Sequence, residues 1–252
     1  MTRRRFYAPP EALSPGESVT LSAEETRHAR DVLRLERGEE VCVFDGEGRE
    51  YRGAIAELNR DSVRVEVLEQ VEPARPESQL HLTLCVALLK GEKFDLVVQK
   101  ATELGATRFI PVVTNRADVR IRSDDDARRK LMRWQRIVLE ASKQCGRARL
   151  MKIDAPVAFA ELIERAEQED ELRLMFAERE GSSFSEVLKE LELMPAKAIA
   201  LIGPEGGWTD GEIDEANKNG WRIVTLGGRV LRAETAAIVA ATLLQHRFGD
   251  LV

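Results

Sequence analysis

Two glycine-containing segments in the last quarter of the chain combine residue types and spacing that could bind a small ligand. Residues 200–208 read ALIGPEGGW, and residues 224–236 read VTLGGRVLRAETA. Each begins as an apolar run and reaches glycine just before a predicted helix, so two strand ends can expose their backbone to one ligand. A tight turn is the ordinary explanation for one glycine-rich segment, but two strand ends with matching chemistry favour a binding site.

Arg232 is the residue of these segments that is best suited to act on charge. A guanidinium beside a glycine-lined pocket can stabilise charge on a bound base or phosphate, and an ion pair with Glu234 or Glu205 is the competing interpretation. Residues 231–237 would open the last helix, where unpaired backbone N–H groups accept anions or polar ligand atoms. Neither segment matches Gly-x-Gly-x-x-Gly or Gly-x-x-x-x-Gly-Lys-Ser/Thr, which disfavours a dinucleotide-dependent enzyme and a kinase.

The elements that must position these residues alternate from Leu80 onward. Residues 82–89 form a continuous apolar run, typical of a strand covered on both faces. Residues 94–104 carry an apolar face at helical spacing, and Gly105 ends that helix. The alternation predicts an α/β fold with a mostly parallel sheet and helices on both faces. The further predicted strands are residues 108–113, 172–176, 198–202 and 222–226, and the further helices lie near residues 125–143, 156–168, 183–193, 210–219 and 234–248.

The first part of the chain has a different, β-rich pattern. Residues 40–44 (EVCVF) and 62–68 (SVRVEVL) are predicted strands of a small barrel or sheet, and residues 26–35 are a predicted short helix. Prolines and polar residues at positions 69–79 indicate a linker. We therefore expect an N-terminal domain over residues 1–72 and a C-terminal domain over residues 73–252.

Composition limits the classes of protein to which the chain can belong. Of its 252 residues, 43% are hydrophobic and 33% are charged, and no apolar run approaches the ~18 residues of a membrane-spanning helix. No apolar stretch follows the arginines near the N-terminus, so we expect no secretory signal and a cytoplasmic protein. Three cysteines and three histidines are scattered, which argues against disulfides and a metal site. A net charge of −6 disfavours a protein that coats nucleic acid non-specifically.

The two glycine segments resemble motifs of the SPOUT methyltransferases, specifically of the RsmE family, which methylates N3 of a uridine in 16S ribosomal RNA. Besides residues 201–208, 226–227 and 231–237, the resemblance includes residues 90–93 (KGEK), 99–105 (QKATELG) and 140–147 (EASKQCGR). Near the N-terminus, residues 3–6 (RRRF) and 28–34 (HARDVLR) are similar to the family's RNA-binding domain. The match covers nearly the whole chain.

This resemblance implies an N-terminal PUA-like β-barrel domain that binds RNA, a C-terminal SPOUT domain with a parallel sheet and a deep trefoil knot, and a homodimer. It implies S-adenosylmethionine as the cofactor, no metal, no membrane, and 16S ribosomal RNA or the small ribosomal subunit as the partner. The cofactor-binding residues that it implies are Met175, Phe176, Leu201, Ile202, Gly203, Pro204, Glu205, Gly206, Leu226, Gly227, Leu231, Thr235, Ala236 and Ala237.

The chemistry of such a transfer assigns roles to two ionisable residues. Methylation of a uridine nitrogen requires alignment of donor and acceptor and the loss of the N3 proton. The ring then carries negative charge, which Arg232, our first catalytic candidate, could stabilise. Glu205 is a candidate base by its location, and it could equally cap the following turn or pair with an arginine.

RNA contacts are expected from arginines and lysines in several segments. Arg3, Arg4 and Arg5 precede two aromatic residues, a combination of phosphate contacts and stacking faces, although a solvated arm is the alternative. Arg30 and Arg34 lie four residues apart on a predicted helix and could extend that surface, or the helix could simply be solvated. The complete expected set is Arg3, Arg4, Arg5, Arg30, Arg34, Lys90, Lys93, Arg116 and Arg147.

Three other functions stay open on the sequence alone. The chain could be a SPOUT-type methyltransferase that acts on another RNA. It could also be a non-catalytic RNA-binding protein with a relict cofactor fold, although the intact glycines and Arg232 disfavour this. A small-molecule enzyme that uses another nucleotide is disfavoured by the missing phosphate loops.

Overall fold

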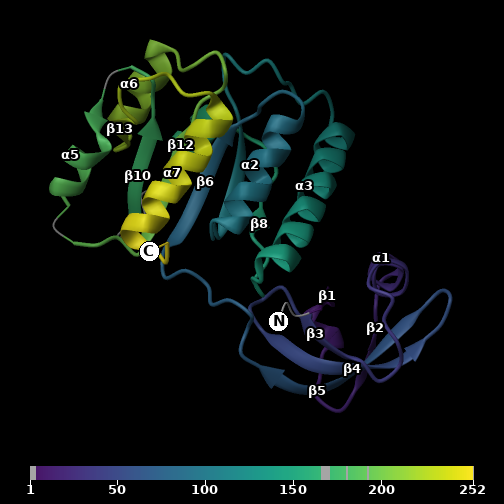
Figure 1. The fold of residues 1–252 in the computed structure, drawn as a ribbon. Coiled ribbons are helices and arrows are strands. Elements are labelled where there is room, and N and C mark those ends of the chain that lie inside the picture. The colour runs from purple at the N-terminus through teal and green to yellow at the C-terminus, as the bar shows by residue number, and fades with distance from the viewer. Residues whose placement is uncertain (1–3, 166–170, 180, 192, 252) are drawn as a thin grey trace. The chain divides into compact units, whose positions relative to one another are not determined.

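The computed structural model describes residues 4–165, 171–179, 181–191 and 193–251, and the chain divides into two compact units (Figure 1). The first unit comprises residues 1–77 together with residues 139–150, and the second comprises residues 78–138 together with residues 151–252. The first unit therefore includes a segment from the middle of the chain in addition to its N-terminal part.

The N-terminal unit is built on a curled five-stranded sheet with the order β1-β3-β4-β5-β2. The alternation at residues 62–68 is confirmed as part of β5, in which Val63, Val65 and Val67 are buried. The neighbouring β4 was not predicted, and its Gly53 lies where a Cβ would come within 2.7 Å of the Glu66 carbonyl oxygen. The strands are β1 (Arg5–Tyr7), β2 (Ser18–Thr20), β3 (Glu40–Phe44), β4 (Glu50–Leu58) and β5 (Val63–Val71).

The predicted helix over residues 26–35 is wrong in its bounds and its geometry. Helix α1 (Ala23–Arg27) begins earlier, with the Ser22 hydroxyl accepting a hydrogen bond from the Glu25 N–H. A wider π-helical turn follows over residues 28–32 and ends the helix. Arg34 then takes a φ of +52°, which is incompatible with a continued right-handed helix. The expected linker over residues 69–79 also begins later, because β5 continues to Val71.

The C-terminal unit contains an eight-stranded sheet whose pairs are all parallel, which confirms the predicted architecture. Its order is β11-β13-β10-β12-β6-β7-β8, with β9 paired to β7. Continuous apolar runs form the central strands, because both faces are covered. The strands are β6 (His81–Ala87), β7 (Arg108–Val113), β8 (Lys152–Ile153), β9 (Val157–Ala158), β10 (Glu171–Phe176), β11 (Ser182–Ser183), β12 (Lys197–Ile202) and β13 (Arg222–Thr225).

Helices cover both faces of this sheet. On one face α2 (Glu92–Glu103) and α7 (Ala233–Phe248) contact each other, and α7 lies across β12 and β6 (Figure 1). On the other face, a core formed by alternate strand residues packs against α4 (Phe159–Ile163) and α6 (Asp210–Lys218). The remaining helices are α3 (Asp124–Cys145) and α5 (Phe184–Lys189).

Two predicted helices are shorter than expected. Helix α4 covers five residues of the predicted 156–168, of which residues 166–168 lie outside the described part of the chain. Helix α5 ends at Lys189, before residue 193, and begins at a capping box between Ser183 and Glu186. Within the described ranges, no helix is long and apolar enough to cross a membrane.

Candidate functional site

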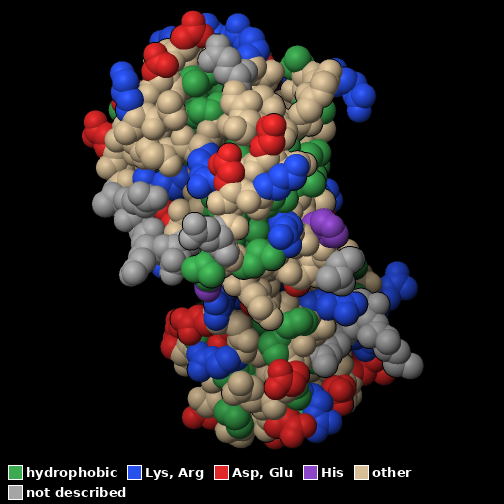
Figure 2. Space-filling view, turned by 90° about the vertical axis from the view of Figure 1, so that its left-hand side faces the viewer, with side chains coloured by type: hydrophobic (Ala, Val, Ile, Leu, Met, Phe, Trp, Pro, Cys, Tyr) green, Lys and Arg blue, Asp and Glu red, His purple; other side chains and the backbone are tan. Residues whose placement is uncertain are grey.

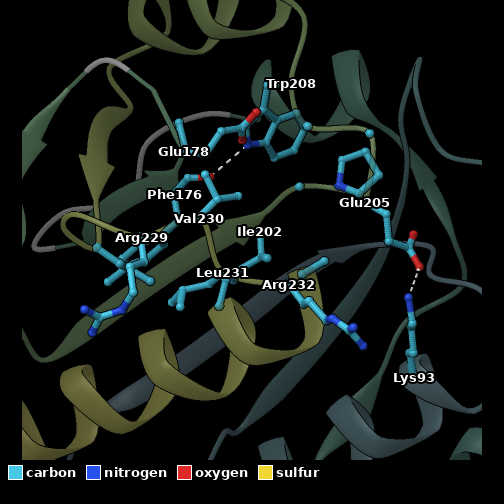
Figure 3. Close-up of a pocket in the computed structure, with 18 of the residues that line it drawn as sticks. Lys93, Phe176, Glu178, Ile202, Glu205, Trp208, Arg229, Val230, Leu231 and Arg232 are labelled. Carbon is cyan, nitrogen blue, oxygen red and sulfur yellow. Dashed lines mark hydrogen bonds and ion pairs between the residues drawn. The ribbon is translucent and has the colours of Figure 1, made fainter.

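A cavity of about 390 Å³ lies where three neighbouring strands of the C-terminal unit end (Figure 3). The register places Phe176 of β10 opposite both Ile202 of β12 and Val224 of β13, so these strands end level with one another. The two glycine segments follow β12 and β13, and the start of α7 closes the cavity. The two segments singled out in the sequence therefore line one cavity.

Most of the residues predicted to bind the cofactor gather in this cavity. Four do not line it: Met175 and Leu201 have no exposed surface and belong to the core against α4 and α6. Ala237 is likewise fully buried, while the Thr235 side chain is exposed. The predicted residues that line it are Phe176, Ile202, Gly203, Pro204, Glu205, Gly206, Leu226, Gly227, Leu231 and Ala236, together with the catalytic candidate Arg232.

Several lining residues were not predicted. Glu178 follows β10 by two residues, and Trp208 and Arg229 belong to the two glycine segments. The predicted role of Phe176 offered one usable signal: if Phe176 faces the ligand, the loop directly after it must border the same cavity. The lining residues that the sequence analysis did not assign to the cofactor are Lys93, Ala177, Glu178, Gly207, Trp208, Arg229, Val230 and Ala233.

The glycines of the first segment accommodate the protein's own side chains. A Cβ at Gly203 would lie 2.9 Å from two atoms of the Trp208 ring, which is 1% exposed. The indole N–H of Trp208 donates a 2.8 Å hydrogen bond to the Phe176 carbonyl (Figure 3). Gly207 has a φ of +68°, and a Cβ there would meet the Glu178 carboxylate. These glycines therefore allow the loop to fold over a buried tryptophan.

Gly227 of the second segment differs from them. Its φ is +98°, a conformation that favours glycine, and no atom lies within 4 Å of an added Cβ. Its open side and the apolar Leu226 and Leu231 border the cavity. This is a place where a ligand can approach bare backbone.

Arg232 lies at the N-cap of α7, and its exposed side chain extends toward the side of the cavity where Lys93 and Glu205 lie (Figure 3). The two residues that the sequence suggested as its ion-pair partners, Glu205 and Glu234, are in different environments. Glu205 pairs with Lys93 at 2.9 Å, and one carboxylate oxygen of Glu234 is buried without a hydrogen-bond partner in the described part of the chain. The guanidinium of Arg232 is therefore placed to act on a ligand.

Glu205 is held as a carboxylate. Partial burial alone would raise its pKa, but hydrogen bonds from Lys93, from its own backbone and from the Lys90 N–H, together with the charge of Lys93, outweigh burial and lower the pKa. A carboxylate with a lowered pKa is a weaker base than an ordinary one. The sequence left open an ion pair between Glu205 and an arginine. The structure has an ion pair at Glu205, but its partner is Lys93.

Two of the residues predicted to bind RNA are buried and have structural partners. Arg5 is 7% exposed, pairs with Glu50 at 3.1 Å and donates to the carbonyls of Ser142 and Arg147 at 2.9 and 3.0 Å. Arg147 is 5% exposed and pairs with Glu77 at 2.7 Å. Their guanidinium groups are occupied inside the N-terminal unit, which contradicts the idea that they present free cations to phosphates.

The other predicted RNA-binding residues lie at the surface, and Arg3 lies outside the described residues. Arg4 pairs with Glu39, Arg30 with Asp31, and Lys90 with Asp118. Arg34 is exposed, but it does not share a helix with Arg30. Lys93 lines the cavity, and Arg116 donates to two carbonyls of the first glycine segment. On the face shown in Figure 2, cationic side chains are interspersed with acidic ones.

A metal-binding group was not expected from the sequence. In the ranges that the structure describes, no three His, Cys, Asp or Glu side chains form a group that could hold a metal ion.

Two family profiles match the chain. The profile described as RNA methyltransferase domain matches residues 76–245, and the profile described as RNA methyltransferase PUA domain matches residues 21–68. The first includes both glycine segments and the whole cavity lining. The second includes α1 and the π-helical turn after it, β3, β4 and most of β5.

Individual relatives agree with these profiles over nearly the full length. Ribosomal RNA small subunit methyltransferase E of Synechocystis is 36% identical over 95% of this chain and 76% of its own. A solved ribosomal RNA small subunit methyltransferase E from Neisseria gonorrhoeae, bound to S-adenosyl methionine, is 31% identical with a TM-score of 0.89, covering 99% of this chain and 100% of its own. A Legionella pneumophila protein solved with the cofactor SAM is 33% identical with a TM-score of 0.90 and covers 100% of both chains.

Proposed function

Because the chain belongs to the RNA methyltransferase family that includes ribosomal RNA small subunit methyltransferase E, we propose that it transfers a methyl group from S-adenosylmethionine to N3 of a uridine in 16S ribosomal RNA. The observation that carries the proposal is the single cavity formed by both glycine segments and the start of α7. Relatives with the same fold are bound to this cofactor. The uridine and its N3 come from the family resemblance.

The residues of the cavity fit S-adenosylmethionine. A volume of about 390 Å³ lies within the range of ligand pockets. Ile202, Leu226 and Leu231 offer apolar walls to an adenine ring, and the open side of Gly227 allows close approach to backbone. Glu178 and Glu205 supply carboxylates to a cofactor that carries cationic groups. When bound, the cofactor supplies an electrophilic methyl group on a sulfonium.

Arg232 is the residue that we propose to act on the uridine. Loss of the N3 proton to solvent leaves negative charge on the base, and the Arg232 guanidinium at the edge of the cavity stabilises that charge while N3 takes the methyl group and the sulfonium becomes a neutral thioether. Lys93, held by Glu205 on the same side, adds a second cation (Figure 3). The lowered pKa of Glu205 makes it a weak proton acceptor, so we propose that catalysis depends more on Arg232 than on Glu205.

RNA binding by the N-terminal unit follows from its PUA profile. We propose that the exposed Arg4 and Arg34 and the half-buried Arg30 of this unit contact phosphates, and that Lys90 of the C-terminal unit makes a phosphate contact of its own. These contacts would release counterions and make binding depend on salt. Arg5 and Arg147 are left out of this set because their guanidinium groups are buried in ion pairs.

Three further properties belong to the proposal through the family resemblance. We propose a homodimer, a trefoil knot in the C-terminal unit and a cytoplasmic location. Sedimentation of the purified protein tests the dimer.

The proposed activity is tested by transfer of labelled methyl groups. The wild-type protein is incubated with labelled S-adenosylmethionine and with unmodified small-subunit ribosomal RNA or small subunits, and label in RNA is counted. We expect incorporation by the wild type and a loss of about 10²-fold or more in kcat for Arg232→Gln. The matched control is Arg222→Gln, which removes an exposed ion pair with Glu190. Arg222 begins β13, at the end of the strand away from the cavity, so this variant is expected to keep wild-type activity. Binding of both substrates without any incorporation would favour the non-catalytic alternative.

A further inference from the structure

Arg116 holds the loop over residues 203–208, which belongs to the first glycine segment, from outside the cavity. It lies after β7, three residues beyond Val113, and its guanidinium Nη1 donates to the Trp208 carbonyl at 2.9 Å and to the Gly206 carbonyl at 3.3 Å. These two carbonyls stand on either side of Gly207, whose φ is +68°. One guanidinium nitrogen therefore bridges the turn in the loop.

The backbone of the loop also rests directly on Arg116. A Cβ at Gly206 would lie 3.1 Å from the Cβ and from the carbonyl oxygen of Arg116, so a larger residue there would push the two segments apart by a few tenths of an ångström. On the other side of the loop, a Cβ at Gly207 would lie 2.3 Å from an oxygen of Glu178. The loop is thus enclosed between the segment after β7 and the segment after β10.

A second tie joins the same segments next to Arg116. The Asn115 N–H donates to the Glu212 carboxylate at 3.1 Å. Glu212 is 2% exposed, and its other oxygen closes a capping box with Thr209, the N-cap of α6. The segment after β7 therefore supports the loop both at its turn and at the start of the following helix.

We infer that Arg116 is a positioning residue for the cofactor, which shapes the loop over residues 203–208 and does not serve as a phosphate contact. This inference rests on the proposed function. Without the guanidinium, the carbonyls of Gly206 and Trp208 form hydrogen bonds with water instead. The loop over residues 203–208 then becomes ordered only when a cofactor binds. That ordering weakens binding but leaves the bound state similar, so the KM for S-adenosylmethionine rises more than kcat falls.

The test compares three variants by S-adenosylmethionine calorimetry, by steady-state kinetics and by RNA binding over a range of salt concentrations. Arg116→Gln removes the charge and the guanidinium, while Arg116→Lys keeps the charge on a side chain that is one atom shorter. Arg120→Gln is the matched control, since Arg120 is an exposed arginine four residues further along the chain after β7. Thermal unfolding of each variant verifies its fold.

Arg116→Gln is expected to weaken S-adenosylmethionine binding about tenfold, which corresponds to the loss of one charge-assisted hydrogen bond. Arg116→Lys is expected to bind with intermediate affinity, and both are expected to keep the wild-type salt slope for RNA. Arg120→Gln is expected to bind the cofactor with wild-type affinity. Wild-type cofactor affinity in both Arg116 variants, or a reduced salt slope alone, overturns the inference. If Arg116→Gln does not fold, Arg116→Lys decides the matter. Failure of the wild type to bind the cofactor would instead overturn the proposed function.

Discussion

Replacing Gly203 by alanine is expected to destabilise the C-terminal unit and to weaken cofactor binding, because the new Cβ enters the space of the Trp208 ring. The two nearest ring atoms lie 2.9 Å from that Cβ position, and the ring is 1% exposed, so neither side can yield into solvent. Overpacking of this kind costs about 1–3 kcal/mol. A shifted ring also loses the 2.8 Å hydrogen bond to the Phe176 carbonyl, which contributes about 1 kcal/mol.

The expected loss of stability is thus about 2–4 kcal/mol, which lowers the Tm of a chain of this size by roughly 10 °C. Thermal and denaturant unfolding measure it, and calorimetry follows the affinity for S-adenosylmethionine. Gly228→Ala is the control, since that glycine lies in the other segment with nothing within 4 Å of an added Cβ. It should leave stability unchanged or raise it by up to about 1 kcal/mol. Equal stability of the two variants would refute the packing argument.

Three further predictions concern ionisable groups. Arg5→Ala removes the cation that neutralises the buried Glu50 carboxylate and should cost about 3–5 kcal/mol of stability, whereas Arg4→Ala should lower RNA affinity at unchanged Tm; the reverse pattern would contradict the assignments. Because the folded pKa of Glu205 is lowered, its pairing with Lys93 stabilises the protein above the ordinary carboxyl pKa of 4.5, and this contribution disappears as the pH falls through the folded pKa. Glu205→Gln should therefore flatten the acid limb of a stability–pH curve, and an unchanged limb would count against the pairing. Arg232→Gln should lower kcat while the Kd for S-adenosylmethionine changes less than threefold, and a purely cofactor-binding role would shift the Kd instead.

The sheet of the C-terminal unit could be predicted because its central strands are mostly apolar. The expected range 108–113 coincides with β7, and the expected range 198–202 differs from β12 by one residue. Strand β4 was missed because Gly53 and its charged neighbours interrupt the apolar pattern, although that glycine is what lets β5 approach. The end of the N-terminal helix was misplaced because the chain widens into a π-helical turn over residues 28–32 and Arg34 then takes a positive φ.

The candidate site could be predicted only as far as its glycine segments. That Trp208 folds back under Gly203 depends on the register of three strands, which the sequence does not display. Arg4 and Arg5 are chemically identical in the sequence, yet strand parity in the three-residue β1 sends Arg5 inward to Glu50. Arg116 was assigned to RNA for its charge, whereas its hydrogen bonds connect it to the loop.

The most direct test of the proposed function is the identity of the methylated nucleoside. Small-subunit ribosomal RNA that has reacted with the protein and labelled S-adenosylmethionine is digested and separated, and the labelled nucleoside is identified by mass spectrometry. We predict a single labelled species, 3-methyluridine, that is lost with Arg232→Gln. Label on another base, or at another position of the uridine ring, would contradict the account.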